Sequence, residues 1–505
     1  MNATLHDGPQ DASSEATETR PILSLAMLLA GSLLVGFSMG SWLAPLAAWI
    51  GPVLIIRYAR DHRVGRGWLL VFAACTLSFA IGFAAIWAAQ WPLLYVVVLP
   101  VLYGLVWSLP YLADRLMSPR LPGFSATLVY PLATAGLEFV NGSVNPVGAW
   151  GATGFTQYGQ LPLMQLASVT GMIGITFLMG WFASVANWAW ENRARSAELR
   201  RGLAVFGLVL AAVFVFGAVR LNLAAPGDTV RVAGITADPT RAMAEPMRQA
   251  PDAAAMRVVI QDHWDVYFEA TAREAKAGAQ LVLWPEISGV MFEPDEASFI
   301  GQAQEVAREQ AIYLAVPFWI WNEETMVPVQ NKLLVFDPAG SIVLEHAKYG
   351  GAIVENTELG DGVLRTVTTP FGVLSGVICW DADYPAVIQQ AGRNGTGLLL
   401  VPASDWAEID PLHTQMAVFR AVENGHSLVR QAEGNVSIAV DPYGQALAQT
   451  DFFDATDRTV VAQVPTAHVD TLYSSFGRWL GWVCVVGFLL LIGYVVARAL
   501  MARRA

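Results

Sequence analysis

Long apolar runs divide this chain into two kinds of sequence. Residues 22–222 and 477–498 form long apolar blocks, whereas residues 228–468 have the composition of an ordinary soluble protein and hold most of the acidic side chains. Over all 505 residues, 54% are hydrophobic and only 14% are charged, which is too apolar a balance for a soluble protein. The pattern predicts a membrane domain with a globular domain inserted into it.

A helix needs roughly 20 apolar residues to cross the hydrocarbon core of a bilayer. Eight segments approach this length, namely 22–37, 42–57, 68–89, 92–113, 124–140, 162–188, 203–221 and 477–497. The fifth is the weakest because Pro131 and Glu138 interrupt it; Glu138 would either face the bundle interior or lie at the outer end of its helix. The sequence therefore predicts seven spans within residues 21–222 and an eighth at 477–498.

The arginines predict how these spans are oriented. They cluster after the second, fourth, sixth and eighth segments, and the alternate connections at 38–41, 90–91 and 141–161 carry no Lys or Arg. Because positive residues favour the cytoplasmic side, residues 1–20 form a predicted cytoplasmic tail and both termini face the cytoplasm. Residues 228–468 are then exoplasmic, which in a diderm bacterium means periplasmic. No cleavable signal peptide is predicted, because the N-terminal tail is polar and acidic.

Charge and cysteine usage narrow the function further. The formal net charge is −12 and no basic patch stands out beyond the predicted cytoplasmic loops, so no nucleic-acid partner is expected. Cys75 and Cys484 fall in predicted spans and Cys379 lies alone in the outer domain, so no disulfide is predicted. The seven histidines show no ligand spacing, and neither a metal site nor a cofactor is predicted.

Strand-like and helix-like segments alternate in the outer domain. Apolar, β-branched runs at 230–235, 280–284, 312–317, 332–336, 373–379, 397–401, 437–440 and 459–464 predict strands. Helical spacing occurs at 258–277, 296–310, 385–394 and 412–424. The predicted fold is an α/β sandwich with helices outside mixed sheets.

Glu286, Lys348 and Cys379 each follow such an apolar run, in QLVLWPE, SIVLEHAK and VLSGVIC. Taken alone, they are most simply a surface carboxylate, a solvated lysine and a small core residue. Taken together, a carboxylate can accept the thiol proton, an ammonium can stabilise an oxyanion, and the thiol can attack a carbonyl to form a thioester. Acyl transfer is the reaction class that uses all three.

Several motifs resemble a known family. WPE at 284–286, HAKYGG at 346–351 and ICWDADYP at 378–385 resemble the Glu-Lys-Cys motifs of the nitrilase, or carbon–nitrogen hydrolase, superfamily. PASDWAEIDPLHTQMAVFRAVENG at 402–425 and VRQAEGNVSIAVDPYGQALAQ at 429–449 resemble the second half of that domain. GAWGATGFTQYGQLPLMQLASVTGMIGITFLMGW at 148–181 resembles the apolipoprotein N-acyltransferases, which are membrane-embedded members of the superfamily.

This resemblance implies eight spans with a nitrilase-like α-β-β-α domain inserted before the last one, in a bacterial inner membrane. It implies that Glu286 is the general base, Lys348 the oxyanion stabiliser and Cys379 the nucleophile. The implied reaction moves an acyl chain from a phospholipid, through a thioester, to the N-terminal amine of a diacylglyceryl-cysteine lipoprotein. Membrane lipids surround both substrates, no cofactor takes part, and the resemblance suggests a monomer.

Some residues depart from the acyltransferase pattern. Lys348 is followed by YGGAIVENTELGDG rather than the usual VPFGEYVP-like stretch, so Glu355 and Glu358 are both candidates to assist the site. Only 31 residues separate Lys348 from Cys379, a spacing closer to that of a soluble nitrilase. Asp381 also stands where the acyltransferases have glutamate. These departures keep open a membrane-anchored amidase or nitrilase-type hydrolase that acts on another exoplasmic amide.

Two tryptophans near Cys379 in the sequence have two possible roles. Trp380 and Trp406 are predicted either to line an apolar mouth for an acyl chain or to pack in the core. A non-catalytic scaffold is the least favoured function, because the three complementary residues are all present.

Overall fold

The computed structural model describes residues 12–194, 196–223, 227–236, 250, 252–351 and 355–504. Helices dominate the N-terminal part and the C-terminal end: α1 (Ala12–Phe37), α2 (Pro45–Asp61), α3 (Val64–Gln90), α4 (Leu93–Met117), α5 (Val129–Val144), α6 (Leu161–Met164), α7 (Ala167–Thr170), α8 (Met172–Glu191), α9 (Ser196–Leu221) and α17 (Trp479–Arg504). Short 3₁₀ turns lie among them at η1 (Ser118–Arg120), η2 (Gly123–Leu128) and η3 (Thr153–Gln157).

Five of the described helices are long and apolar enough to cross a membrane. They cover Val64–Ala89, Leu93–Arg120, Met172–Glu191, Ala197–Leu221 and Trp479–Ala502. The predicted segments at 22–37, 42–57 and 124–140 are helical but shorter, with an apolar helix at Ile22–Phe37, 17 residues in α2 and 16 in α5. The chain is thus a membrane protein with five apolar helices of spanning length, and a count of eight spans stays a prediction.

The predicted span at 162–188 is wrong as a continuous helix. Gly171, with φ of 68°, ends α7, and α8 starts only at Met172. Positive φ is a conformation that glycine adopts readily and other residues rarely do, so it stops a helix. Residues 153–170 therefore form short helical turns, η3, α6 and α7, and the apolar helix begins after them.

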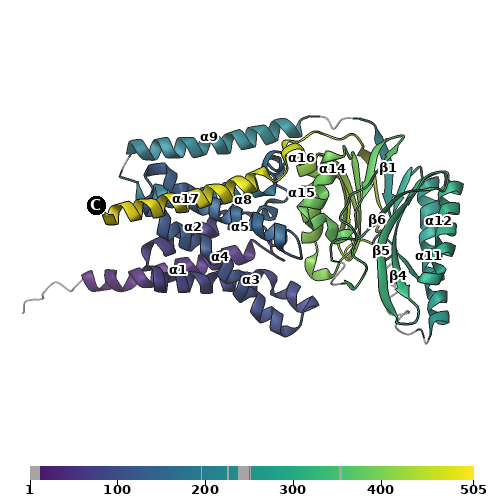
Figure 1. The fold of residues 1–505 in the computed structure, drawn as a ribbon, viewed down its shortest axis with the longest axis horizontal. Helices are drawn as coiled ribbons and strands as arrows, with labels where there is room; N and C mark the ends of the chain where they lie inside the picture. The colour runs from purple at the N-terminus through teal and green to yellow at the C-terminus, as the bar shows by residue number, and fades with distance from the viewer. Residues whose placement is uncertain are drawn as a thin grey trace, which may run out of the picture. The chain divides into compact units, whose positions relative to one another are not determined.

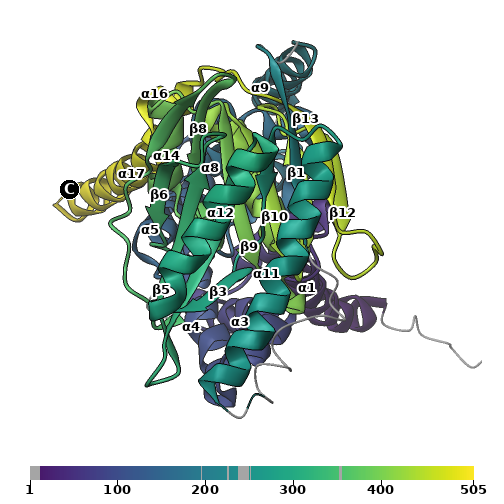
Figure 2. The same ribbon diagram turned by 90° about the vertical axis from the view of Figure 1, so that its right-hand side faces the viewer.

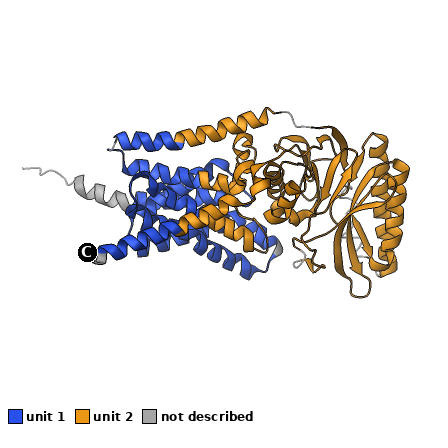
Figure 3. Ribbon diagram, turned by 45° about the horizontal axis from the view of Figure 1, so that its top comes forward, with its two compact units in different colours: residues 1–134, 179–206, 490–505 blue, residues 135–178, 207–489 orange. Residues whose placement is uncertain are grey.

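Two compact units divide the chain, coloured separately in Figure 3. One holds residues 1–134, 179–206 and 490–505, and the other holds residues 135–178 and 207–489. The second unit therefore contains the α/β domain together with the segment 135–178. All site residues described below belong to this second unit.

The α/β domain contains two sheets. The first has the order β13-β1-β2-β4-β5-β6, with β3 paired to β4, from β1 (Thr229–Gly234), β2 (Leu281–Leu283), β3 (Gly289–Phe292), β4 (Tyr313–Asn322), β5 (Val327–Phe336), β6 (Ile342–Ala347) and β13 (Val460–Pro465). The second has the order β12-β11-β10-β9-β8-β7, from β7 (Thr366–Thr369), β8 (Gly372–Gly376), β9 (Leu398–Ser404), β10 (Ser427–Glu433), β11 (Val436–Val440) and β12 (Ala446–Asp451). The central pairs β1–β2, β2–β4, β8–β9 and β9–β10 are parallel.

Apolar side chains hold these layers together. One cluster packs Trp264 of α11 (Ala253–Lys276) and Phe299 of α12 (Glu296–Gln310) against the first sheet, and Figure 2 shows both helices across its face. A second cluster joins residues of the two sheets to each other. On the second sheet, α15 (Leu412–Asn424) contacts β10 and β11, and α14 (Pro385–Arg393) packs against α15 (Figure 1). Because β2 and β6 of one sheet and β8 and β9 of the other share this interior, the residues that follow them can meet.

Candidate active site

Cys379 lies at the start of a tight turn. After β8, two extended residues lead to Cys379, the first residue of the 3₁₀ turn η6 (Cys379–Asp383). Its φ is 46°, in the left-handed region that residues other than glycine rarely occupy. Such backbone strain persists only where the surroundings determine the conformation strongly, and it clusters at functional sites. The side chain is buried, and Cys379 is 5% exposed.

Asp381 holds this turn in place. Its Oδ2 accepts from the backbone N–H of Ile378 at 2.9 Å, and its Oδ1 accepts from the N–H groups of Tyr349 and Gly350 at 2.9 and 2.6 Å. His346 Nε2 lies 2.7 Å from Oδ2. Although burial opposes its ionisation, these partners lower the pKa of Asp381. The carboxylate therefore ties the residues after Lys348 to the turn that begins at Cys379.

Glu286, Lys348 and Glu355 form one cluster, in which Glu286 and Lys348 are buried and Glu355 is partly exposed. The Lys348 ammonium donates to Glu286 Oε1 at 2.6 Å and also to Glu355 Oε1. Asn331 Nδ2 donates to Glu286 Oε1 at 2.7 Å, and the backbone N–H of Ser404 donates to Oε2 at 3.0 Å. The structure thus brings Glu355 to the lysine. It leaves Glu358 exposed, with its Oε2 3.1 Å from Gln330 Nε2.

The charges around the thiol set its resting state. Burial raises the pKa of Cys379, and the nearby carboxylates Glu286 and Asp405 raise it further, while Lys348 and Arg430 act in the opposite direction. Burial works against the Lys348 ammonium, but Glu286, Cys379 and Glu355 together raise its pKa. At neutral pH the site therefore holds a neutral thiol beside a charged ammonium. Such a thiol needs a base to become a nucleophile.

A second charged cluster touches the thiol, and its role did not follow from the sequence motifs. Cys379 Sγ lies 3.5 Å from Asp405 Oδ1 and 3.9 Å from the Ser404 carbonyl oxygen. Asp405 Oδ1 is 2.7 Å from His413 Nδ1, and its Oδ2 accepts from Arg430 Nη2 at 2.6 Å. One feature of the sequence does indicate a buried charge at this place. Arg430 interrupts a buried strand, and a charge in such a strand requires a partner.

Cys379, Asp405 and His413 have the ligand types of a metal site, and their ligand atoms all lie within 4.8 Å of one another. The ion pairs around them favour a different role. Burial lowers the pKa of His413, but Asp383 and Asp405 outweigh it and raise the pKa to about 9. Arg430 already occupies the other Asp405 oxygen, and Asp383 lies 3.0 Å from the other ring nitrogen of His413. We therefore interpret the cluster as an ion-pair network.

Comparison with known proteins accounts for most of the chain. Residues 247–473 match the carbon–nitrogen hydrolase family, and residues 29–185 match the apolipoprotein N-acyltransferase N-terminal domain. The chain combines these two domains. It is 24% identical to the apolipoprotein N-acyltransferase of Gloeobacter violaceus, over 97% of both chains. It is also 24% identical to that of Geobacter metallireducens, over 72% of this chain and 73% of the relative.

Solved structures give a weaker likeness. A variant of an amidase from Nesterenkonia sp. is 21% identical and matches 51% of this chain and 98% of its own, with a TM-score of 0.40. This likeness adds nothing to the domain matches, by which the chain is an enzyme of the nitrilase superfamily and, by homology, an N-acyltransferase.

In this two-domain enzyme, Trp380 of the turn that begins at Cys379 pairs with Trp406. The rings of Trp380 and Trp406 lie 6.2 Å apart in an edge-to-face arrangement. Both indole Nε1 atoms are buried, and neither has a hydrogen-bond partner among the described residues. Buried indole N–H groups usually find an acceptor. The pair therefore provides apolar surface beside the turn and two donors that an oxygen of a bound substrate can satisfy.

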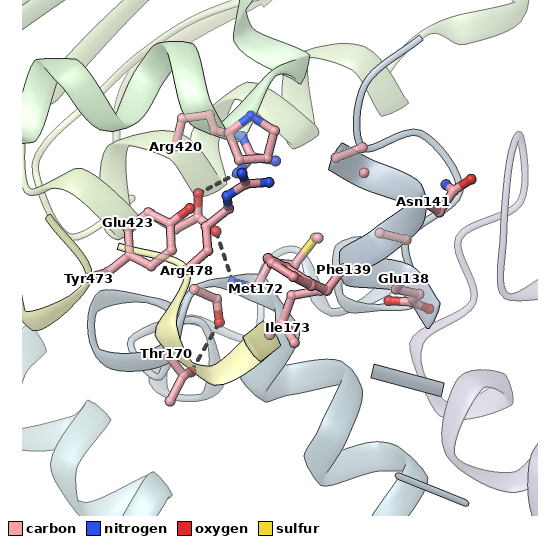
Figure 4. A pocket seen from close by; sticks show the side chains of 16 residues that line it. Glu138, Phe139, Asn141, Thr170, Met172, Ile173, Arg420, Glu423, Tyr473 and Arg478 are labelled. Carbon is pink, nitrogen blue, oxygen red and sulfur yellow. Dashed lines mark hydrogen bonds and ion pairs between the residues drawn. The ribbon is translucent and has the colours of Figure 1, made fainter. Parts of the chain in front are cut away.

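A small recess of about 30 Å³ is lined by residues that include Glu138, Met172, Arg420 and Glu423 (Figure 4). Ala149, Ala152 and Pro385 also line it. Arg420 donates to Glu423 and, through Nε, to the Ala382 carbonyl oxygen of the turn at 3.1 Å. Cys379 does not line this recess.

Proposed function

We propose that this protein transfers an acyl chain from a phospholipid to the N-terminal amine of a diacylglyceryl-cysteine lipoprotein. The observation that carries the proposal is the buried Lys348–Glu286 pair, 2.6 Å apart, in the domain that also holds the strained Cys379. The apolipoprotein N-acyltransferase N-terminal domain at 29–185 supports a substrate that lies in the membrane.

In the first half-reaction Glu286 accepts the Cys379 thiol proton, and the thiolate attacks the ester carbonyl carbon of the phospholipid. The Lys348 ammonium stabilises the resulting oxyanion. The carbon–oxygen bond then breaks, and the leaving alkoxide of the lysophospholipid takes the proton from Glu286. Cys379 is left as a thioester.

In the second half-reaction the neutral lipoprotein amine attacks the thioester carbonyl carbon. Glu286 accepts a proton from the attacking nitrogen, the carbon–sulfur bond breaks, and the departing thiolate recovers that proton. The products are an amide and the free enzyme. Burial of the site matters here, because water that reached the thioester would hydrolyse it.

The proposal includes a location. We place the enzyme in a bacterial inner membrane with both termini in the cytoplasm and the α/β domain on the exoplasmic side, as the arginine distribution predicts. Both substrates are then membrane lipids or lipid-anchored proteins. Reporter fusions after Asn222 and at Ala505 test this topology, and signals from the same side of the membrane would overturn it.

A membrane-anchored amidase is the second candidate. The spacing of 31 residues between Lys348 and Cys379 and the aspartate at 381 favour it, because both resemble soluble nitrilases. Such an enzyme would use the same triad and release the acyl group to water.

One experiment separates the two functions. The purified protein in phospholipid–detergent micelles receives phospholipid with a labelled acyl chain, and then a diacylated lipopeptide with a free amine. We expect the label first on Cys379 and then as an amide on the peptide. Hydrolysis of simple amides without any labelled enzyme would support the amidase instead. Cys379→Ala should abolish both activities, whereas Cys75→Ala, within the membrane helix α3, should retain them.

A further inference from the structure

The segment 145–153, called here the docking loop, packs against the turn that carries the nucleophile. The Tyr384 hydroxyl donates to the Pro146 carbonyl oxygen, and the Ala149 backbone N–H donates to the Asp383 carbonyl oxygen at 2.9 Å. Trp150 Nε1 donates to Asp383 Oδ2 at 2.7 Å. These residues lie in the GAWGATGF stretch, to which the proposed chemistry assigns no task.

The shape of the loop allows no side chain where it comes closest. Gly148 has φ of 68°, and a Cβ there would lie 2.5 Å from the Asp383 carbonyl oxygen. Because real Cβ atoms do not approach oxygen so closely, any other residue would push the loop away from the turn.

The far end of the loop is fixed by Glu138. Its Oε1 accepts from the Thr153 backbone N–H at 3.0 Å and from the Thr153 hydroxyl. Its Oε2 accepts from the Thr176 hydroxyl at 2.7 Å. The buried carboxylate is thus fully used in joining the loop to α5 and α8. The loop is held at both ends, by Glu138 on one side and by Asp383 on the other.

From Asp383 a continuous chain of contacts reaches the thiol. Asp383 Oδ2 lies 3.0 Å from His413 Nε2, His413 Nδ1 lies 2.7 Å from Asp405 Oδ1, and that oxygen lies 3.5 Å from Cys379 Sγ. Asp383 Oδ1 is buried and has no hydrogen-bond partner in the part of the chain that the structure describes. Trp150 and His413 therefore both act on the same oxygen, so loss of the indole donor frees the carboxylate to turn.

We propose that Trp150 is a positioning residue for the Cys379 nucleophile, and that the docking loop acts on the thiol through Asp383, His413 and Asp405. The inference rests on the proposed function only in naming the reaction; the effect on the thiol stands apart from it. Trp150 also packs against the imidazole, with ring centroids 5.4 Å apart.

The charge of His413 is set from several elements. Asp383 faces it from η6, Asp405 from the end of β9, and Arg430 from β10, with Arg430 Nη2 3.0 Å from His413 Nδ1. The two carboxylates raise the pKa of His413 to about 9 against burial and Arg430. With Asp383 fixed by Trp150, His413 stays an imidazolium and holds Asp405 in line with the thiol.

The test measures alkylation of Cys379 by iodoacetamide across pH in the full chain, in micelles, with Cys75 and Cys484 replaced by alanine. Trp150→Phe should slow alkylation and acyl-enzyme formation by about tenfold, a change that corresponds to roughly 1.4 kcal/mol. Trp479→Phe is the matched control, because it removes an indole donor that binds the Val169 carbonyl oxygen at 2.9 Å instead. Equal effects in the two variants would overturn the proposal.

A glycine pair tests the loop without removing a hydrogen bond. Gly148→Ala strains the backbone and displaces the loop, whereas Gly159→Ala strains a residue with φ of 81° whose Cβ would meet nothing within 4 Å. We expect slower alkylation in the first variant only. If both alter the rate equally, backbone strain explains the effect and the inference fails.

Asp383→Asn provides a readout that a structural role would not move. It removes one of the two carboxylates that raise the pKa of His413. The pH at which the alkylation rate changes because His413 loses its proton should therefore fall by about one unit. If the variant has a normal thermal unfolding transition and is therefore folded, but its profile of alkylation rate against pH is unshifted, the proposal is contradicted. If alkylation changes as expected while wild-type enzyme takes no label from phospholipid, the proposed function fails and the positioning role stands.

Discussion

Two charged clusters meet at Cys379, and they differ in what they connect it to. Glu286, Lys348 and Glu355 are all supplied by the first sheet and the segment that follows it. Asp405, His413 and Arg430 belong to the second sheet and α15, and through Asp383 they reach the docking loop. The first cluster has the groups that, in the proposed reaction, exchange protons and stabilise charge. The second is a string of alternating charges that holds one carboxylate beside the thiol.

The two clusters differ in their expected roles, with chemistry assigned to the first and positioning of the thiol to the second. A buried ion pair that loses one partner leaves an uncompensated charge in a low-dielectric interior, which is costly wherever it lies. Loss of a group that takes part in the reaction should, in addition, remove nearly all activity. Substitutions in the first cluster should therefore stop the reaction, and substitutions in the second should slow it.

The largest effect is expected for Lys348→Met. The variant leaves the buried Glu286 and the partly exposed Glu355 without their cation and removes the proposed oxyanion stabiliser. We expect acyl-enzyme formation to fall by at least about 10³-fold and the free energy of unfolding by about 3–5 kcal/mol. Labelling of Cys379 and denaturant unfolding measure the two. Lys332→Met, which removes a less buried pair with Glu296, is the control. A variant that kept a tenth of the rate would exclude Lys348 from the chemistry.

Asp405→Asn should have an intermediate effect. The amide keeps the size of the side chain but leaves Arg430 and His413 without their shared carboxylate. We expect acylation to slow by about 10–100-fold, since the thiol loses its aligned neighbour but keeps Glu286 as base. Single-turnover kinetics measure this, and Asp470→Asn, at a fully exposed side chain, serves as the control. Complete loss of acylation in a folded Asp405→Asn protein would move Asp405 into the proton-transfer machinery and end the distinction between the clusters.

The second cluster should also make the stability of the folded protein depend on pH. The pKa of His413 is about 9 in the folded protein against 6.5 for an ordinary histidine. Because the folded value is raised, the stabilisation is complete below pH 6.5 and is lost as pH rises through about 9. The change is on the order of 3 kcal/mol. The melting temperature should fall across this window, and His413→Gln should flatten the dependence while His468→Gln should not. If the melting temperature of His413→Gln falls over the same pH range as that of the wild type, a group other than His413 causes the pH dependence.

The two clusters were unequally visible in the sequence. Glu286, Lys348 and Cys379 each follow an apolar run, and because strand ends gather at one place in α/β sheets, the sequence predicts that they lie close together. The structure pairs Glu286 with Lys348 at 2.6 Å, and the full triad stays a prediction. Asp405 and His413 lie in the quoted run at 402–425, but neither carries a spacing that assigns it a partner. Their contacts depend on how β9, β10 and α15 pack, which local sequence does not encode.

The membrane region shows the same limit. Apolar length predicted the helices at α3, α4, α9 and α17 well, because bilayer thickness sets that length. Composition could not reveal that Gly171 breaks the segment 162–188, since apolar residues continue on both sides. Likewise, Glu138 looked like an interruption of a span. Its role in joining the docking loop to α5 and α8 depends on Thr153 and Thr176, which only tertiary packing brings to it.

The smallest effects should distinguish the two glutamates that the sequence could not. Glu358 is exposed and its carboxylate bonds to Gln330, away from Lys348, so Glu358→Gln should leave acylation within about twofold of wild type. Glu355 touches Lys348, but burial raises the pKa of Glu355 even though Lys348 acts to lower it. Because Glu355 lies at the partly exposed edge of the cluster and an amide oxygen can still accept from the ammonium, Glu355→Gln should slow acylation only about threefold, far less than Lys348→Met. The same single-turnover assay measures all three variants. A loss in Glu355→Gln as large as in Lys348→Met would mean that the Glu355 charge is essential, and that the first cluster works as a carboxylate pair around one ammonium rather than as a single base with its cation.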